Sequence, residues 1–361
     1  MALVIEIIPY SLAFKFAART SRGPMTEHNT WILKVWDDNQ PLVLGYGECA
    51  PFEGLSIDHR PDYSQKIKLA LKAIDGREIP ASLDDIATYV SFIDNRLPSV
   101  KMGLETALRD LYYDGQQKIF DSSFYNQHSN IDINGLVWMG DQDEMLTRLR
   151  EKVKMGYNCV KLKIGALNFS DELEIIKQAR AMKDAENLSL RVDANGAYTV
   201  SEAKKVLNDL AVYQIHSIEQ PIKAGQREAM KELCATSPVP IALDEELIGI
   251  SNWQKKKELL VTIKPQFIVL KPTLLGGFNA TAEWIDLAQN LNIGWWITSA
   301  LESNIGLNAI CQFTAQYDLR MPQGLGTGGL YHNNVPSPLK INKGKIFLDE
   351  DKQWNFHLLK L

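Results

Sequence analysis

The sequence lacks the features that mark several classes of protein. Only four of its 361 residues are cysteine, and no two of them form a CxxC pair. The common zinc and redox motifs are therefore absent, and a disulfide framework is not expected at this density. No run of about 18 apolar residues is present, so we predict no membrane span. Glu6 and Pro9 interrupt the apolar N-terminal stretch, which has no basic segment and does not read as a signal peptide. We expect a reduced, cytoplasmic protein.

Positive charge is not concentrated anywhere in the chain. The formal net charge is -5, and there is no long basic run. This balance argues against nucleic acid as a partner and leaves a small molecule as the expected one. The short lysine run at Lys255–Lys257 lies in a helix-like segment, and we interpret it as a solvated face. The sequence leaves a homo-oligomer possible without requiring one.

Residues 1–125 read as an α+β domain. Residues 15–29 are polar, contain Gly and Pro, and are expected to form a loop, whose length is typical of functional lids. In that loop Arg22 and Thr26 are candidates for closing the site. The expected strands are 4–14, 30–38 and 41–51, and the expected helices are 61–74 and 102–114.

Residues 126–330 alternate between short apolar runs and amphipathic helices. Such alternation implies a parallel sheet, and eight units at this spacing predict a (β/α)8-type barrel. An open doubly wound sheet is the alternative, but no GxGxxG follows an early strand. Residues 331–361 are expected to return to the first domain. The expected barrel strands are 133–139, 159–165, 189–196, 216–221, 241–246, 267–272, 294–300 and 320–326.

The stretch CVKLKIG, Cys159 to Gly165, places two lysines on one face of a predicted strand. An exposed strand with solvated lysines would explain this pattern. In a barrel, however, the outward face meets helices and must be apolar, so Lys161 and Lys163 would both point inward. Two inward ammonium groups need carboxylates or a ligand to compensate their charge.

Three later strands supply such carboxylates near their C-terminal ends. They are Asp193, Glu219 and Asp244, separated by 26 and 25 residues, about one βα unit each. Barrel active sites form at these strand ends, and three converging carboxylates repel one another without a cation. Oxygen ligands suit magnesium or manganese rather than zinc. Three unrelated strand-end acids are the alternative. Lys271 occupies the equivalent place on the next strand.

Arg191 and Asn195 alternate with Asp193, so all three can face inward. Asn195 reads as a neighbour of the metal ligands, as a substrate contact, or as a turn former before Gly196. The residues alone do not choose among these roles.

Taken together, the motifs KLKIG, RVDANGAYT, IEQP, LDEE and LKPTLLGG resemble the enolase superfamily, in its muconate-lactonizing subgroup. The resemblance implies an N-terminal capping domain that closes over the barrel. It implies that Asp193, Glu219 and Asp244 bind magnesium or manganese. It also implies that Lys163 is the acid/base and that Lys271 faces it across the site. Lys161 would then lower the pKa of Lys163 and contact the substrate carboxylate.

Two stretches near the end of the predicted barrel, WITSALESNIGLNAI and MPQGLGTGGLY, are similar to the o-succinylbenzoate synthase family. This similarity implies a carbon–oxygen lyase of menaquinone biosynthesis. The expected reaction is syn-dehydration of 2-succinyl-6-hydroxy-2,4-cyclohexadiene-1-carboxylate to 2-succinylbenzoate. Two alternative interpretations remain here: Ser303 can serve simply as a helix cap, and GLGTGG can form a phosphate-binding loop. The expected substrate contacts are Arg191, Asn195, Thr298, Ser299, Ser303 and Gly324.

Other activities fit parts of the same pattern. An N-acylamino acid racemase or dipeptide epimerase would use Lys163 and Lys271 as two bases, although QGLGTGG has no acid to hold an amino group. A Schiff-base aldolase would use a buried barrel lysine and need no carboxylate cluster. A non-catalytic metal-binding barrel would not need competent lysines at these positions.

Overall fold

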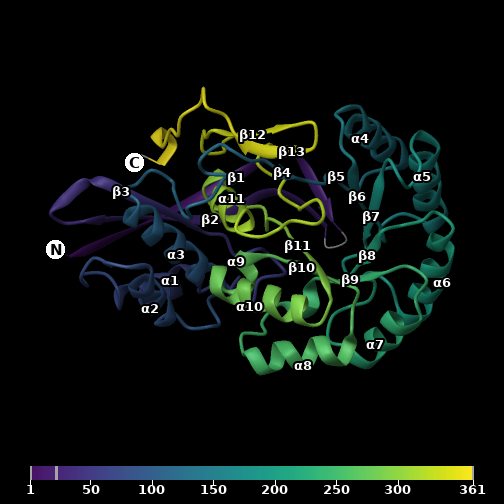
Figure 1. The fold of residues 1–361 in the computed structure, drawn as a ribbon, viewed down its shortest axis with the longest axis horizontal. Helices are drawn as coiled ribbons and strands as arrows, with labels where there is room; N and C mark the ends of the chain where they lie inside the picture. The colour runs from purple at the N-terminus through teal and green to yellow at the C-terminus, as the bar shows by residue number, and fades with distance from the viewer. Residues whose placement is uncertain (1, 21–22, 360–361) are drawn as a thin grey trace.

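The computed structural model describes residues 2–20 and 23–359. An antiparallel sheet with helices α1 to α3 lies on one side of the molecule, and a curved parallel sheet with its surrounding helices lies on the other (Figure 1). Within the described residues, no helix is long and apolar enough to cross a membrane.

The antiparallel sheet contains β1 (Leu3–Thr20), β2 (Gly23–Asp37) and β3 (Gln40–Cys49), in that order. Helices α1 (Tyr63–Lys72), α2 (Leu83–Ser91) and α3 (Pro98–Tyr112) follow. Helix α3 packs so closely on β3 that a Cβ at Gly47 would lie 2.0 Å from the carbonyl oxygen of Gly103. Glycine at this position therefore allows the helix to cover the sheet.

The prediction of a loop over residues 15–29 is wrong for the residues of this range that the structure describes. β1 and β2 pair in an antiparallel ladder up to Thr20 and Gly23, with a register shift between Ala13 and Ala18. The polar side chains of this segment do not show the alternation that predicts a strand. Backbone hydrogen bonds between β1 and β2 nevertheless hold it in a hairpin. Thr26 lies in β2, whereas Arg22 falls outside the described residues.

Seven strands form the curved parallel sheet, and their spatial order follows the chain. They are β5 (Gly135–Val137), β6 (Cys159–Lys163), β7 (Ser189–Asp193), β8 (Ser217–Glu219), β9 (Ile241–Leu243), β10 (Phe267–Leu270) and β11 (Gly294–Ile297).

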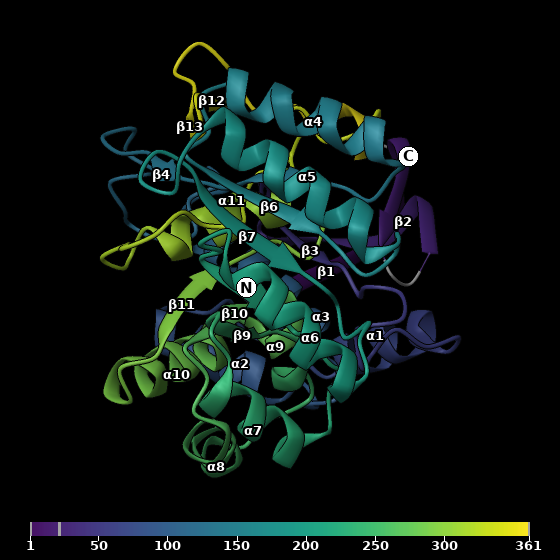
Figure 2. The same cartoon turned by 90° about the vertical axis from the view of Figure 1, so that its right-hand side faces the viewer.

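Helices connect these strands and cover the outer face of the sheet (Figure 2). Val160 and Leu162 of β6 are buried in the main hydrophobic core, which satisfies the apolar half of the strand pattern. The helices are α4 (Gln142–Lys154), α5 (Phe169–Met182), α6 (Val200–Ala211), α7 (Arg227–Thr236), α8 (Trp253–Ile263), α9 (Pro272–Leu275), α10 (Gly277–Asn290) and α11 (Asn304–Thr314), with a 3-10 turn η1 (Glu245–Leu247) after β9.

Gln323 and Gly324 form hydrogen bonds with β11 at one edge of this sheet and with the chain just before β5 at the other edge. Gln323 N donates to Asp132 O at 2.8 Å, and Gly324 N donates to Ile297 O at 2.8 Å. The segment forms isolated parallel bridges and not the full strand expected over 320–326. Pro322 has no N–H to donate, which limits its backbone pairing to these few bonds.

A second antiparallel sheet contains β12 (Leu339–Asn342), β13 (Lys345–Leu348) and β4 (Ile131–Asp132). The chain then runs back to the first sheet, where the Phe356 ring stacks on Tyr46 with centroids 4.1 Å apart. Leu359, in the last 3-10 turn η2 (His357–Leu359), is buried in a cluster with Ile8 and Ile32.

The lysine run in α8 is not uniformly solvated. Lys256 is fully buried, and its Nζ lies 2.8 Å from both Ala280 O and Glu283 Oε2. The expectation of a solvated face is therefore wrong at Lys256, because α10 packs against this side of α8 and supplies acceptors for the ammonium group.

Candidate active site

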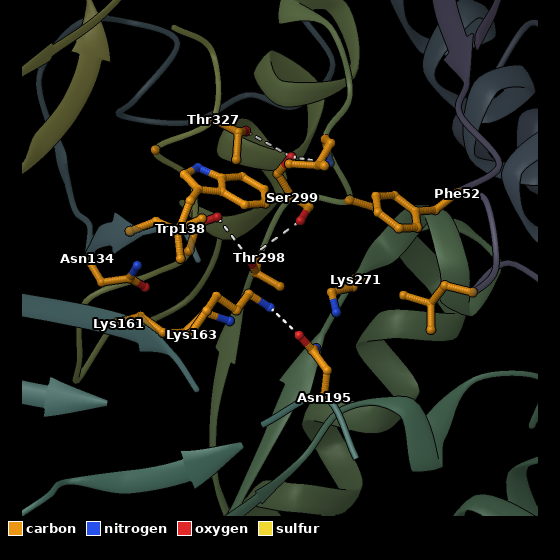
Figure 3. A pocket seen from close by; sticks show the side chains of 16 residues that line it. Phe52, Asn134, Trp138, Lys161, Lys163, Asn195, Lys271, Thr298, Ser299 and Thr327 are labelled. Carbon is orange, nitrogen blue, oxygen red and sulfur yellow. Dashed lines mark hydrogen bonds between the residues drawn. The ribbon is translucent and has the colours of Figure 1, made fainter. Parts of the chain in front are cut away.

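A cavity lies where the strands of the parallel sheet end, and residues that follow β3 line part of it (Figure 3). Most of the residues expected from the sequence as catalytic or substrate-binding groups line it. They are Lys161, Lys163, Asn195, Lys271, Thr298, Ser299 and Gly324.

Lys161 is the more deeply paired of the two β6 lysines. Its Nζ lies 2.9 Å from Asp193 Oδ2 and 2.9 Å from Glu219 Oε2. Burial lowers the pKa of Lys161, but the charges of Asp193 and Glu219 outweigh burial and raise it above its ordinary value. Lys161 is thus a fixed positive charge at the base of the cavity.

Lys163 has the opposite character. Its Nζ donates to Asp193 Oδ2 at 2.5 Å and to Asn195 Oδ1 at 2.8 Å. Burial and the nearby charge of Lys161 lower the pKa of Lys163, against the attraction of Asp193. A lysine with a lowered pKa gives up its proton more readily and so can serve as a base.

Lys271 enters the cavity from the end of β10, facing the lysines of β6 (Figure 3). Its Nζ donates to Asp244 Oδ2. Burial lowers the pKa of Lys271, but the charges of Asp244, Glu245 and Glu219 outweigh burial and raise it. Lys163 and Lys271 therefore differ in how tightly each holds its proton.

Asp193, Glu219 and Asp244 lie at the ends of the neighbouring strands β7, β8 and β9, and each is at most 2% exposed. Burial, together with the charges of Asp193 and Asp244, raises the pKa of Glu219 to about 8. As the side chains stand, no group of three or more His, Cys, Asp or Glu among the described residues is arranged to hold a metal ion. The lysine ammonium groups pair with these carboxylates instead.

The chemistry of this donor set nevertheless suits a hard divalent cation. It consists of carboxylate oxygens, which magnesium and manganese prefer. Burial is the largest cause of the raised pKa of Glu219, and the neighbouring charges of Asp193 and Asp244 add to it. A cation bound here would relieve the repulsion and release the lysines from their present pairs.

The structure does not bring Arg191 and Ser303 to this cavity. Arg191 lies deeper in the sheet interior, where Nη1 donates to Pro322 O at 2.9 Å and the guanidinium lies 4.1 Å from the Trp296 ring centroid. Ser303 caps α11, and its Oγ donates to Glu48 Oε2 of β3. Alternation along β7 predicted that Arg191 points inward, but it does not predict how far from the cavity an inward side chain lies.

The hydroxyl groups on the cavity wall already have partners. Thr298 Oγ1 donates to Gly324 O at 2.9 Å. Ser299 Oγ donates to Glu302 Oε2 at 2.6 Å and accepts a hydrogen bond from Thr327 Oγ1 at 2.9 Å. These bonds hold the wall in one arrangement.

Several cavity residues were not predicted from the sequence. Alternation along the first barrel strand could have identified Asn134, Leu136 and Trp138, which all line the cavity. Phe52 and Leu55 also line it, but they follow β3 without periodicity, so no comparable signal marks them.

Comparisons with known proteins agree with this geometry. Residues 144–352 match the family described as "Enolase C-terminal domain-like". The o-succinylbenzoate synthase of Desulfotalea psychrophila is 41% identical over 357 residues, covering 93% of this chain and 96% of that protein. The o-succinylbenzoate synthase of Enterococcus faecalis is 27% identical, over 95% of this chain and 91% of that protein.

Solved structures extend the comparison to the fold. The crystal structure of MenC from Desulfotalea psychrophila has a TM-score of 0.86 and 38% identity, and the match covers 96% of this chain and 100% of that one. The L-Ala-D/L-Glu epimerase of Bacillus subtilis has a TM-score of 0.82 at 19% identity, which shows a shared fold alone. The chain therefore belongs to the enolase superfamily, in the family of the o-succinylbenzoate synthases.

Proposed function

We propose that this protein is an o-succinylbenzoate synthase, a hydro-lyase that converts 2-succinyl-6-hydroxy-2,4-cyclohexadiene-1-carboxylate to 2-succinylbenzoate in menaquinone biosynthesis. One observation carries the proposal. Lys163 and Lys271 share a cavity next to three buried carboxylates, in a chain 41% identical to a synthase over nearly its whole length.

Asp193, Glu219 and Asp244 would hold magnesium, or manganese in its place. Their oxygen-only chemistry and their positions at the ends of three neighbouring strands support this assignment. When bound, the cation offsets the second negative charge that develops on the substrate carboxylate as the neighbouring proton leaves.

Lys163 acts first as the base and then as the acid. Its neutral amine takes the proton from C1, whose electron pair moves into the enediolate. The resulting ammonium returns a proton to the departing C6 hydroxyl on the same face, so that water leaves and the ring becomes aromatic. The lowered pKa of Lys163 supports this double role.

Lys161 and Lys271 act as fixed positive charges. Both have raised pKa values, because buried carboxylates face them. Lys161 would contact the substrate carboxylate, and Lys271 would stabilise the enediolate without exchanging its proton. This division fits an elimination on one face better than racemisation, which requires two bases.

The cavity lining also suits the proposed substrate. Leu136, Trp138 and Phe52 provide apolar surface for a ring, while Asn195, Thr298, Ser299 and Gly324 are the proposed neighbours of its polar groups. Among the described lining residues there is no Asp or Glu to hold the amino group of a dipeptide. A dipeptide epimerase is therefore not proposed.

We infer that the parallel sheet is a closed (β/α)8-type barrel, because Gln323 and Gly324 bond to β11 and to the residues just before β5. Residues 1–125 would form the capping domain, 126–330 the barrel, and 331–361 the segment that returns to the cap. A reduced, cytoplasmic setting is proposed from the four free, buried cysteines.

The direct test is to incubate the purified protein with the cyclohexadiene carboxylate and magnesium, and to identify the product by mass spectrometry. The proposal predicts loss of one water molecule and formation of 2-succinylbenzoate. No conversion by the folded protein would overturn it.

A further inference from the structure

One amide in the cavity has hydrogen-bonding capacity that the protein does not use. Asn134 immediately precedes β5 and lines the cavity beside Lys161 (Figure 3). The residue is 5% exposed, and no described residue donates to its buried Oδ1. Within the described part of the chain, its Nδ2 donates only to the carbonyl of Gly135, at 3.3 Å, the long end of the hydrogen-bond range. Buried amides are normally paired, so this one points to a missing partner.

The other polar side chains of the cavity differ from Asn134. Asn195 uses both ends of its amide, accepting from Lys163 and donating to Glu245 Oε1 at 3.0 Å. Thr298 and Ser299 donate their hydroxyl protons to other protein oxygens. Asn134 is therefore better placed to receive a ligand without first breaking bonds within the protein.

The chemistry of the amide narrows the choice of ligand group. Because the Gly135 carbonyl accepts from Nδ2, the amide is oriented with Oδ1 as a free acceptor and Nδ2 as a weakly used donor. A carboxylate only accepts, so it would leave Oδ1 unpaired. A hydroxyl both donates and accepts, so it can use both ends of the amide.

We propose that Asn134 is a substrate-binding residue that holds the departing C6 hydroxyl. This inference rests on the proposed function, because that hydroxyl is the only one on the proposed substrate outside its carboxyl groups. The C6 hydroxyl donates its proton in a hydrogen bond to Asn134 Oδ1. This bond orients a lone pair of the hydroxyl oxygen toward the ammonium of Lys163.

The proposed elimination conserves atoms, protons and electrons. Lys163 Nζ accepts the C1 proton, and the C1–H electron pair is held in the enediolate. As the C6–O bond breaks, this pair forms the new double bond between C1 and C6. The leaving oxygen keeps the C6–O electron pair and takes one proton from Lys163, so it departs as water. Asn134 exchanges no proton and acts only through its hydrogen bond.

Asn134→Leu tests the assignment, because leucine has a similar size and no polar group. Two quantities are measured with magnesium present: kcat/KM for dehydration, and the Kd of 2-succinylbenzoate by calorimetry. The product keeps both carboxylates and the succinyl carbonyl but has lost the hydroxyl. We expect kcat/KM to fall about 10- to 100-fold, because a buried hydroxyl loses its partner, while the product Kd stays within about twofold.

Ile133→Val is the matched control, since Ile133 is the adjacent residue and packs in the main core. It should change neither quantity by more than about twofold. If Asn134→Leu does not fold, Asn134→Ala replaces it with the same expectations.

Two results would overturn the inference. One is an unchanged kcat/KM in a folded variant. The other is a product Kd that weakens as much as kcat/KM falls, which would assign Asn134 to a group that the product retains. Turnover of the proposed substrate by the wild-type protein is measured as a separate test of the proposed function. If it is absent, the proposed function itself is wrong and this inference falls with it.

Discussion

Lys163 Nζ lies 2.5 Å from Asp193 Oδ2, so the proposed base is paired with a proposed metal ligand. The same carboxylate oxygen also receives Lys161, at 2.9 Å. A cation bound to Asp193 would weaken both ion pairs, because it competes for the carboxylate. Metal binding would thereby help to free Lys163 for proton transfer.

Lys163→Ala should abolish most of the activity without preventing metal binding. Removal of a general acid–base group lowers kcat by about 10²- to 10⁴-fold, and Lys163 performs both proton transfers in this account. The measurement is steady-state dehydration at saturating substrate and magnesium. Lys255→Ala, which removes an exposed lysine of α8, is the control and should retain full turnover. Comparable rates in wild type and Lys163→Ala would refute the assigned role.

Glu219→Gln should weaken metal binding. Its carboxylate is one of three proposed ligands, and its loss removes a negative charge from the donor set. We expect the Kd of manganese, measured by electron paramagnetic resonance, to rise by at least about 10-fold, since even indirect supports of a metal site contribute that much. Glu228→Gln alters an exposed acid on α7 and should leave the Kd unchanged. Equal affinities in the two variants would show that Glu219 is not a ligand.

The pH dependence of kcat/KM should report the ionisation of Lys163. Its amine must be neutral to act, so activity falls as the pH drops through its pKa. The charge of Lys161 lowers that pKa. Lys161→Gln should therefore raise the pKa of Lys163 and move the acid limb of the profile to higher pH. A limb that stays in place or moves to lower pH would contradict this coupling.

Glu48 should make the stability of the protein depend on pH. Burial is the main cause that raises its pKa from 4.5 to about 7, and Ser303 and Gly306 donate to it. The folded state then binds a proton that the unfolded state has released. The free energy of unfolding should therefore decrease by roughly 3 kcal/mol as the pH rises from about 4.5 to 7.

Urea unfolding of wild type and Glu48→Gln across that pH range measures this contribution. The variant should show a smaller decrease, whereas Glu27→Gln, at an exposed position of β2, should follow the wild type. Parallel stability profiles for all three proteins would rule out a titrating Glu48.

Strand periodicity predicted much of the cavity. Val160 and Leu162 pack outward while Lys161 and Lys163 line the cavity, because alternation is a property of the strand itself. The spacing of Asp193, Glu219 and Asp244 likewise placed them on neighbouring strands. These features depend on local pattern and chain order, which a sequence displays directly.

Other features depend on packing between distant segments. Lys256 is buried because α10 supplies its partners, and Arg191 lies beside Trp296 rather than in the cavity. The β1–β2 hairpin is paired through a polar stretch that reads as a loop. No local pattern reports contacts of this kind, so the sequence did not predict them.

The central claim is that a divalent cation and Lys163 together dehydrate the cyclohexadiene carboxylate. The most direct measurement follows the absorbance change on aromatisation with magnesium, with excess EDTA, and after magnesium is restored. The account predicts rapid turnover, its loss with EDTA, and its recovery with magnesium. Turnover that persists in EDTA, or none with magnesium present, would contradict it.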